Sequence, residues 1–308
     1  MSESVKKYDV IIIGGGPAGL SAGIYTSRAR LRSLLIEKGA IGGQIINAEK
    51  VENYPGFAEG ISGIDLTTAM HQQATKFGLE TLTDEVSSIE VKGKEKLVKT
   101  TQGDFIAGAV IIAGGSERQK LGVPGEAKYT GKGVSYCATC DGAFFRGKTV
   151  AVIGGGNAAV TEALELTKFA AKIILVHRRN ELRATKIMQE KLLADTRIQV
   201  SWDSAVQEII GDTFVKQIRL RNVKTNKETV IDVSGVFVSV GSQPATGYLK
   251  GLLNLDAVGA IVTNGRLETS VPGIFAAGDI RSGSIRQVIG AAGDGAMAAV
   301  NAGKYLSE

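Results

Sequence analysis

A glycine-rich turn that follows a short apolar run occurs twice in this sequence, and this repeat restricts the fold more than any other feature. The first copy reads Tyr8–Ile13, then Gly14-Gly15-Gly16-Pro17-Ala18-Gly19, then a helix expected from Leu20 to Arg30. The second reads Val150–Ile153, then Gly154-Gly155-Gly156-Asn157-Ala158-Ala159, again before a helical pattern. Strand, glycine turn and helix in this order are typical of a dinucleotide-binding βαβ unit. The repeat predicts an α/β fold with two Rossmann-like dinucleotide-binding domains.

An acidic residue supports this interpretation of the first copy. The next predicted strand, from Ser33 to Ile36, ends in Glu37, about twenty residues beyond the turn, where an acid that binds a ribose hydroxyl is expected. Glycines let a pyrophosphate approach the backbone, and the following helix presents unpaired N–H groups and the positive end of its dipole. The first copy therefore predicts a dinucleotide site.

The second copy has basic residues where the first has an acid. Its second strand is followed by His177-Arg178-Arg179, with Arg183 one helical turn further. Arginines form bidentate, charge-assisted hydrogen bonds to phosphate, whereas an acid would repel a 2′-phosphate. The pattern favours NADPH over NADH, and the alternative is a basic helix start without a ligand. Strand-like runs between 198 and 240 follow, several of them expected to pair antiparallel.

The only two cysteines stand close together in the run Cys137-Ala138-Thr139-Cys140-Asp141. Such a pair can alternate between dithiol and disulfide. No stretch approaches the roughly 20 apolar residues of a membrane span, and a cytoplasmic location is expected. In that reducing compartment a cysteine pair is catalytic or metal-binding more often than structural. Zinc would need about four ligands, which two cysteines and the distant His71 and His177 supply poorly.

Length and charge add two constraints. With 308 residues the chain exceeds the size of one growing core, so two domains are expected. The net charge of +5 is unevenly distributed, because residues 168–197 are strongly basic. This segment is a solvated helical face, or a site for an anionic ligand or an acidic protein partner. Nucleic acid is disfavoured because the segment lacks interleaved aromatic residues and a recognisable motif.

The C-terminal part contains another apolar strand that ends in glycine and an acid. It reads Gly273-Ile274-Phe275-Ala276-Ala277-Gly278-Asp279, and Arg286-Gln287-Val288 then opens a helix rich in small residues. These could be a further buried strand and helix with a polar cap. Equally, Asp279 could reach a sugar-like hydroxyl, and the helix N-terminus could point its dipole at an electron-rich ring.

Taken together, these motifs and Gly42-Gly43-Gln44 occur in the order found in the bacterial and archaeal low-molecular-weight thioredoxin reductases, which the chain resembles along its whole length. The resemblance implies a homodimeric flavoprotein. Residues 1–115 and 246–308 would form an FAD-binding domain, and residues 116–245 an NADPH-binding domain that carries the redox-active disulfide. Glycine-bearing joints between the domains fit a rotation that presents the disulfide and NADPH to the flavin in turn.

The resemblance also implies roles for individual residues. Cys140 would be the sulfur that meets the flavin, Cys137 the sulfur that attacks thioredoxin, and Asp141 the acid/base that moves the proton. The FAD-binding residues would be Gly14, Gly16, Pro17, Ala18, Glu37, Lys38, Gly43, Gln44, Asn53, Gly278, Asp279, Arg286, Gln287 and Val288. The NADPH-binding residues would be Gly155, Gly156, Asn157, Ala158, His177, Arg178, Arg179 and Arg183.

The implied activity is reduction of thioredoxin by NADPH through FAD and the Cys137–Cys140 pair. Two departures from the family pattern, Ala113-Gly114-Gly115 in place of Ala-Thr-Gly and Ala245 in place of Asn, lie at the proposed joints. Rival hypotheses are a flavin-dependent disulfide reductase fed by ferredoxin or another donor, a reductase of a peroxiredoxin-type protein, and a non-catalytic flavin redox sensor. His177-Arg178-Arg179 argues against the ferredoxin-fed rival. The first strand is expected to begin at Tyr8, whereas peroxiredoxin reductases commonly carry an extra N-terminal disulfide module, which disfavours the second rival.

Overall fold

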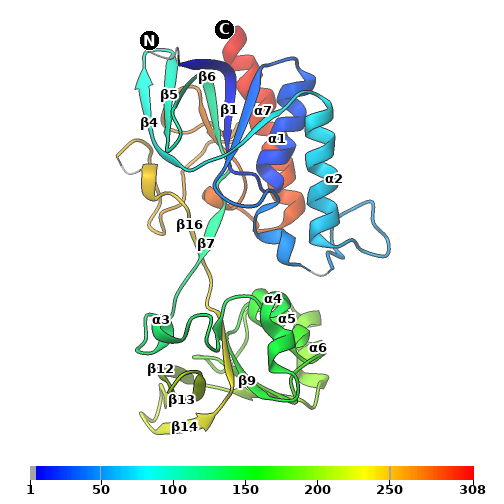
Figure 1. The fold of residues 1–308 in the computed structure, drawn as a ribbon, viewed down its shortest axis with the longest axis vertical. Helices are drawn as coiled ribbons and strands as arrows, with labels where there is room; N and C mark the ends of the chain where they lie inside the picture. The colour runs from blue at the N-terminus through cyan, green and yellow to red at the C-terminus, as the bar shows by residue number, and fades with distance from the viewer. Residues whose placement is uncertain (1–4, 49, 250) are drawn as a thin grey trace. The chain divides into compact units, whose positions relative to one another are not determined.

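The computed structural model describes residues 5–48, 50–249 and 251–308, and the side chain of Cys140 lies outside the described part. The chain divides into two compact units, each shown in Figure 1. The first unit runs to Glu117 and resumes at Gln243, and the second is Arg118–Ser242. Both are built of parallel strands with helices, so the predicted α/β class, with one Rossmann-like domain inserted in another, is confirmed.

Among the described residues, the first unit contains a seven-stranded sheet in the order β3-β2-β1-β6-β5-β4, with β17 also paired to β6. Its strands are β1 (Lys6–Ile13), β2 (Ser33–Glu37), β3 (Glu80–Thr83), β4 (Val86–Lys92), β5 (Glu95–Thr100), β6 (Asp104–Ile112) and β17 (Ile274–Ala276). Strands β3, β2, β1, β6 and β17 are parallel, whereas β4, β5 and β6 form an antiparallel meander. The parallel half matches the Rossmann pattern.

Three helices of the first unit lie on one face of this sheet: α1 (Pro17–Arg28), α2 (Gly63–Lys76) and α7 (Val288–Ser307) (Figure 1). Alternation along β1 explains this layering. Val10 and Ile12 pack toward the helices, while Ile11 and Ile13 pack on the opposite face. The expected helix from Leu20 to Arg30 in fact begins at Pro17, since proline suits a first helical position. The unit also has short 3₁₀ turns η1 (Gly43–Asn47), η3 (Gly247–Leu249) and η4 (Gly278–Ile280).

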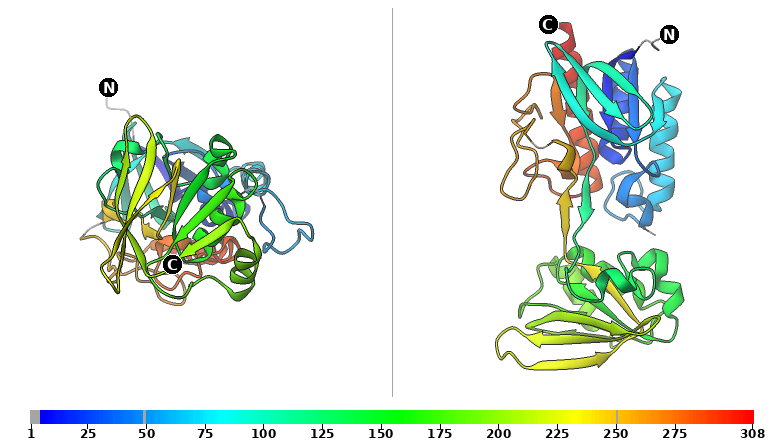
Figure 2. Two further views of the ribbon diagram at one scale, coloured as in Figure 1. Left: turned by 90° about the horizontal axis from the view of Figure 1, so that it is seen from below. Right: turned by 60° about the vertical axis from the view of Figure 1, so that its left-hand side comes forward.

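The second unit repeats the topology with fewer strands. Its parallel sheet has the order β11-β10-β9-β15-β8, formed by β8 (Val134–Ser135), β9 (Thr149–Gly154), β10 (Lys172–Val176), β11 (Ile198–Ser201) and β15 (Gly235–Ser239). The expected antiparallel strands form a separate sheet (Figure 2) of β12 (Ser204–Gly211), β13 (Val215–Asn222) and β14 (Glu228–Asp232). Its helical elements are α3 (Glu126–Tyr129), α4 (Ala138–Asp141), η2 (Gly142–Phe145), α5 (Asn157–Leu166) and α6 (Lys186–Ala194).

Two extended segments connect the units. They are β7 (Ser116–Arg118) and β16 (Ser242–Pro244), which pair as a two-stranded sheet. Gly115 and Gly241, next to these strands, have positive φ angles of 65° and 123°. Such angles are accessible to glycine and strained for other residues. Within the described ranges, none of the helices combines the length and the apolar character that crossing a bilayer requires.

Candidate nucleotide-binding and redox sites

The first glycine turn lies at the carboxyl end of β1 and contains two kinds of glycine. Gly14 has a φ of 110°, and a Cβ there would collide with the carbonyl oxygen of Ala113; a Cβ on Gly19 would collide with the carbonyl oxygen of Gly14. Gly16 is different, because the atom nearest to its Cβ position is the Cα of Gly43 at 3.9 Å. Gly16 is also the N-cap of α1, without a side-chain cap. Its open space and the uncapped N–H groups suit a pyrophosphate.

Glu37 closes this turn from the end of β2. Its Oε2 accepts a 2.6 Å hydrogen bond from Gly15 N, and its Oε1 accepts one of 2.9 Å from Gly39 N. Glu37, the acid that the sequence indicated, therefore lies directly beside the turn. The neighbouring Lys38 forms an exposed ion pair of 2.7 Å with Glu117.

The loop that begins with η1 brings three more predicted residues toward the turn. Gly43 lies against Gly16, with 3.0 Å between the Gly43 Cβ position and the Gly16 Cα. The Gln44 amide donates to the carbonyl oxygen of Ser116. Asn53 Nδ2 donates a 2.8 Å hydrogen bond to Oε1 of Gln287. A side chain of this loop and the start of α7 are thus directly linked.

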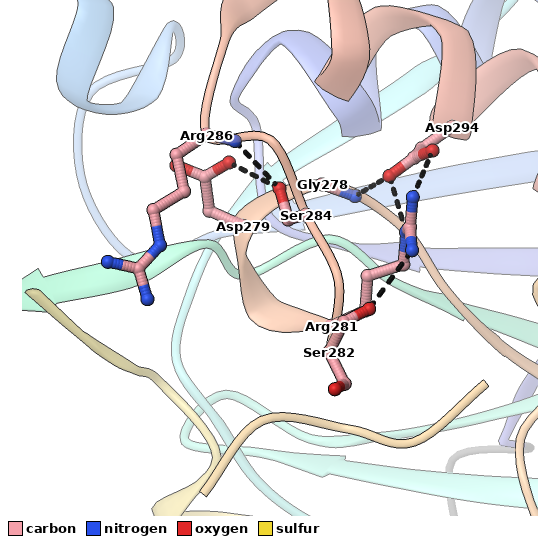
Figure 3. A network of polar contacts seen from close by, with 7 residues as sticks. All are labelled: Gly278, Asp279, Arg281, Ser282, Ser284, Arg286 and Asp294. Atoms are coloured by element: carbon pink, nitrogen blue, oxygen red, sulfur yellow. Dashed lines mark hydrogen bonds and ion pairs between the residues drawn. The ribbon is translucent and has the colours of Figure 1, made fainter. Parts of the chain in front are cut away.

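The C-terminal part of the site surrounds η4 and the start of α7 (Figure 3). Asp279 Oδ1 accepts a 3.1 Å hydrogen bond from the hydroxyl of Ser284, and the same hydroxyl oxygen accepts Arg286 N at 3.1 Å. Burial raises the pKa of Asp279 above its ordinary value, although Ser284 and Arg286 oppose the shift. Gln287 is the N-cap of α7 and provides no side-chain cap, and Val288 is the first helical residue. The N–H groups of this helix start are free to face a ligand.

The second glycine turn, in the second unit, repeats this design. A Cβ on Gly155 would collide with the imidazole ring of His177, whereas the Cβ position of Gly156 has nothing within 4 Å. Gly156 is the N-cap of α5 and carries no side-chain cap. Asn157 Oδ1 accepts Thr185 N at 2.8 Å and so fixes the chain that leads into α6. Ala158 stands exposed in the first turn of α5.

A cavity of about 330 Å³ lies beside this turn. It opens where β9, β10 and β15 end, which is where ligands bind in parallel α/β sheets. Its lining consists of Gln119, Lys120, Leu121, Val123, Ile153, Gly154, Gly155, Val176, His177, Arg178, Arg183, Ser204, Ala205, Val206, Ser239 and Val240. Of the four predicted basic residues, Arg179 is not in the lining. Arg178 and Arg183 are exposed, and neither has an ion pair with a described residue.

His177 differs from the arginines beside it. Its side chain is buried, with 5% of its surface exposed, and its Nε2 finds no hydrogen-bond partner among the described residues. Burial lowers the pKa of His177, and the charges of Arg183, Arg179 and Arg178 lower it further. The ring is therefore neutral at pH 7, and it packs against Gly155 and edge-on to Trp202.

The predicted redox pair lies at α4, which packs against α5; Cys137 immediately precedes this helix and Cys140 is within it. Cys137 is disulfide-bonded, and the sequence contains one other cysteine, Cys140, whose side chain is outside the described part. Asp141 N donates to the Cys137 carbonyl oxygen at 3.2 Å. The Asp141 carboxylate accepts a 2.6 Å hydrogen bond from the hydroxyl of Ser135. A disulfide and an oriented carboxylate at the same short helix are suited to thiol–disulfide exchange with proton transfer.

Comparison with known proteins defines the class. The family model described as pyridine nucleotide-disulphide oxidoreductase matches residues 8–295. The chain belongs to this family, and within it to the thioredoxin reductases. Thioredoxin reductases of Listeria innocua and Bacillus subtilis are 46% and 47% identical to it over 310 aligned residues, covering 100% of this chain and 97% of each relative. A crystal structure of Lactococcus lactis thioredoxin reductase shares 43% identity with a TM-score of 0.95, covering 97% of this chain and 99% of that one.

Several residues that support the site were not found from the sequence. Ser135, which contacts Asp141, lies two residues before Cys137 but carries no motif of its own. Arg281 and Asp294 hold the η4 loop through contacts that sequence spacing does not reveal. Phe144, three residues after Asp141, is 75% exposed. Its only signal in the sequence is an aromatic residue next to a cysteine pair.

Proposed function

We propose that the chain is an NADPH-dependent thioredoxin reductase that binds FAD in its first unit and NADPH in its second. The observation that carries the proposal lies on α5. The N-terminus of this helix lies at the glycine turn beside the arginine-lined cavity, and α4, which directly follows the disulfide-bonded Cys137, packs against the same helix. A nucleotide site and a redox disulfide thus share one small unit. When bound, FAD supplies the two-electron chemistry that links NADPH to this disulfide.

The first unit offers the contacts that FAD requires. Gly14, Gly16, Pro17 and Ala18 would receive the pyrophosphate, and Glu37 a ribose hydroxyl. The open space at Gly16 and the uncapped start of α1 support this assignment. Asp279 would bind the ribityl chain. The residues that line the flavin ring would be Gly43, Gln44, Asn53, Gly278, Arg286, Gln287 and Val288. Lys38 would lie at the edge of the ribose site.

The second unit offers the contacts that NADPH requires. Gly155, Gly156, Asn157 and Ala158 would receive the pyrophosphate at the start of α5. Arg178 and Arg183 line the cavity and would hold the 2′-phosphate, with Arg179 beside them. We assign His177 a different part, because a buried, neutral ring that fills the space at Gly155 would shape the turn rather than attract charge.

At the disulfide, the chain's own residues would manage the protons. Thiolate attacks a disulfide, so the Cys137 thiol must lose its proton before it attacks thioredoxin. Asp141 would accept and return that proton, and Ser135 would hold the carboxylate in place through its 2.6 Å hydrogen bond. In this scheme Cys140 is the sulfur on the flavin side.

Partner and assembly are further parts of the proposal. The exposed ring of Phe144, next to the redox helix, would contact thioredoxin. Lys186 and Lys191, both exposed, would attract an acidic thioredoxin. A homodimer would use the outer face of α7, where Ile289, Met297 and Val300 are exposed. Analytical ultracentrifugation tests the dimer, charge reversal at Lys186 and Lys191 tests the attraction, and cell fractionation tests the expected cytoplasmic location.

One experiment discriminates between the proposal and its rivals. The purified flavoprotein is titrated anaerobically with NADPH and with NADH, and turnover with thioredoxin is then measured for the native chain and for Cys137→Ser. We expect NADPH to bleach the flavin in both proteins, and thioredoxin reduction only in the native one. If neither nicotinamide bleached the flavin, a ferredoxin-fed reductase would be favoured. Bleaching without any disulfide reduction would favour a redox sensor, and turnover by Cys137→Ser would refute the role of that sulfur.

A further inference from the structure

Asp294 and Arg281 form a largely buried ion pair at the end of β17 (Figure 3). Oδ2 of Asp294 accepts Arg281 Nε at 2.6 Å, and Oδ1 accepts Arg281 Nη2 at 2.8 Å. The side chains are 12% and 20% exposed, respectively. Arg281 Nη1 also donates to the carbonyl oxygen of Ser282 at 3.0 Å. This fork geometry fixes both side chains more firmly than a surface ion pair would.

The same carboxylate also holds the backbone next to Asp279. Oδ2 of Asp294 accepts a 3.0 Å hydrogen bond from Gly278 N. Gly278 has a φ of 78°, and its Cβ position lies 3.0 Å from the Cβ of Ala18 and 3.5 Å from that of Ala291. A Cβ on Gly295, the residue after Asp294, would collide with the carbonyl oxygen of Ala18. Asp294 therefore joins the η4 loop to α7 at the place where α7 touches the first turn of α1.

We propose that Asp294, held by Arg281, is a positioning residue of the flavin site, which sets the direction of the Asp279 carboxylate by fixing the Gly278 N–H. This inference rests on the proposed FAD site of the first unit. Its physical reason is that Gly278 directly precedes Asp279 in a short turn, so a shift of the Gly278 backbone also moves the Asp279 side chain. A displacement of about 1 Å at Asp279 is enough to disrupt a polar contact to a ligand.

Arg281 neutralises the charge of Asp294 in addition to donating two hydrogen bonds to it. Asp279 is itself buried, and the nearby charge of Asp294 adds to the effect of burial on its pKa. Without Arg281, the Asp294 carboxylate would be buried and uncompensated beside a second carboxyl group. Removal of Arg281 alone is therefore expected to weaken FAD binding more than removal of both members of the pair does.

The test measures FAD affinity in Asp294→Asn, Arg281→Ala and Asp294→Ala/Arg281→Ala, with Glu95→Gln as control, because Glu95 forms only an exposed ion pair with Lys7. Flavin released on dilution of the holoenzyme is followed by its fluorescence, and visible circular dichroism reports the surroundings of the bound flavin. We expect the Kd for FAD to rise about tenfold in Asp294→Asn, which weakens hydrogen bonds to a charged group, and more in Arg281→Ala, which leaves a buried charge without its partner. The double variant should bind FAD more tightly than Arg281→Ala, and Glu95→Gln should bind as the native chain does.

A second measurement separates positioning from general stability. If Asp294 acts through Asp279, then Asp294→Asn should weaken FAD binding much less in an Asp279→Ala background than in the native one. The inference would be overturned if Asp294→Asn raised the Kd for FAD by the same factor in the Asp279→Ala background as in the native chain. It would also be overturned if the Kd for Asp294→Asn lay within twofold of the native value. Failure of the native chain to bind FAD would instead refute the proposed function, so the two failures are distinguishable.

Discussion

The hydroxyl of Ser135 donates a 2.6 Å hydrogen bond to Oδ2 of Asp141, and its oxygen accepts the N–H of Cys137 at 3.0 Å. Ser135 thus fixes the carboxylate relative to the backbone of the redox cysteine. We predict that Ser135→Ala lowers kcat for thioredoxin about tenfold, since a hydrogen bond to a charged group contributes about 1.5–3 kcal/mol. FAD content and reduction of the flavin by NADPH should not change.

Steady-state and stopped-flow absorbance measurements check this prediction, with two matched variants. Ser135→Thr keeps the hydroxyl and should retain most of the activity. Ser87→Ala removes an exposed hydroxyl, which donates only to the Lys99 carbonyl oxygen, and should have no effect. An unchanged kcat in Ser135→Ala would mean that Asp141 needs no orienting partner.

The second prediction concerns Arg178 and Arg183, which line the cavity of the second unit. Arg183→Ala should lower kcat/KM for NADPH about tenfold or more and leave that for NADH unchanged, since only NADPH carries the 2′-phosphate. Arg178→Ala should act in the same direction. Lys227→Ala is the control, because this exposed residue of the same unit does not line the cavity. Equal losses with both nucleotides would show that the arginines support the fold and not the phosphate.

The third prediction follows from Glu162 on α5. Burial raises the pKa of this carboxyl from 4.5 to about 7, although Arg118, 2.7 Å away, opposes the shift. The folded state then binds more protons than the unfolded state between pH 4.5 and 7, so the free energy of unfolding falls as pH rises through this window and levels off above it. The loss is at most about 3 kcal/mol.

Glu162→Gln should remove this dependence, because an amide carries no charge and can still accept from Arg118. The variant should match the native protein near pH 5 and unfold at a higher urea concentration at pH 8. Fluorescence of Trp202, the single tryptophan, reports unfolding of the unit that contains Glu162. Glu165 lies on the same helix and pairs with Lys168 just beyond the end of the helix, so Glu165→Gln should retain the pH dependence. The same pH profile in Glu162→Gln and the native protein would contradict the prediction, whereas the lowered pKa of His177 acts equally in both proteins.

Much of the fold follows from local sequence. The glycine turns, the apolar strands before them and Glu37 at the end of β2 are set by short-range rules, because a parallel βαβ unit needs a tight turn and a buried strand. The same rules placed Arg178 and Arg183 near the second turn, and both line its cavity. The antiparallel β12–β14 sheet was likewise expected from its strand pattern.

What the sequence did not predict depends on long-range contacts. Asp294 meets Arg281 and Gly278 only because α7 crosses α1 closely, through Gly295 and Ala18. The resemblance grouped His177 with the arginines around the 2′-phosphate, but the sequence did not show that its ring is buried against Gly155, because burial is a property of the packed fold. The sequence likewise does not show that the pKa of Glu162 is raised, because the burial that raises it comes from the packed fold.

The last prediction uses the two glycines with open Cβ positions. Gly16 and Gly156 have φ angles of −76° and −93°, which alanine adopts without strain, and neither Cβ position is within 3.5 Å of another atom. Alanine should therefore change the free energy of unfolding without ligand by less than about 1 kcal/mol, because the lower entropy of its unfolded chain opposes its weaker preference for an N-cap position. The added methyl group would nevertheless occupy the space proposed for a pyrophosphate.

We expect Gly16→Ala to raise the Kd for FAD at least about tenfold without changing the Kd for NADPH, and Gly156→Ala to do the reverse. Each variant is the control for the other, and urea unfolding of the ligand-free proteins confirms that the fold is intact. Gly14→Ala offers a contrast, because its methyl group would collide with Ala113 and its φ of 110° is strained for alanine, so it should destabilise the first unit itself. Native FAD affinity in Gly16→Ala would place the pyrophosphate elsewhere and refute the assigned site.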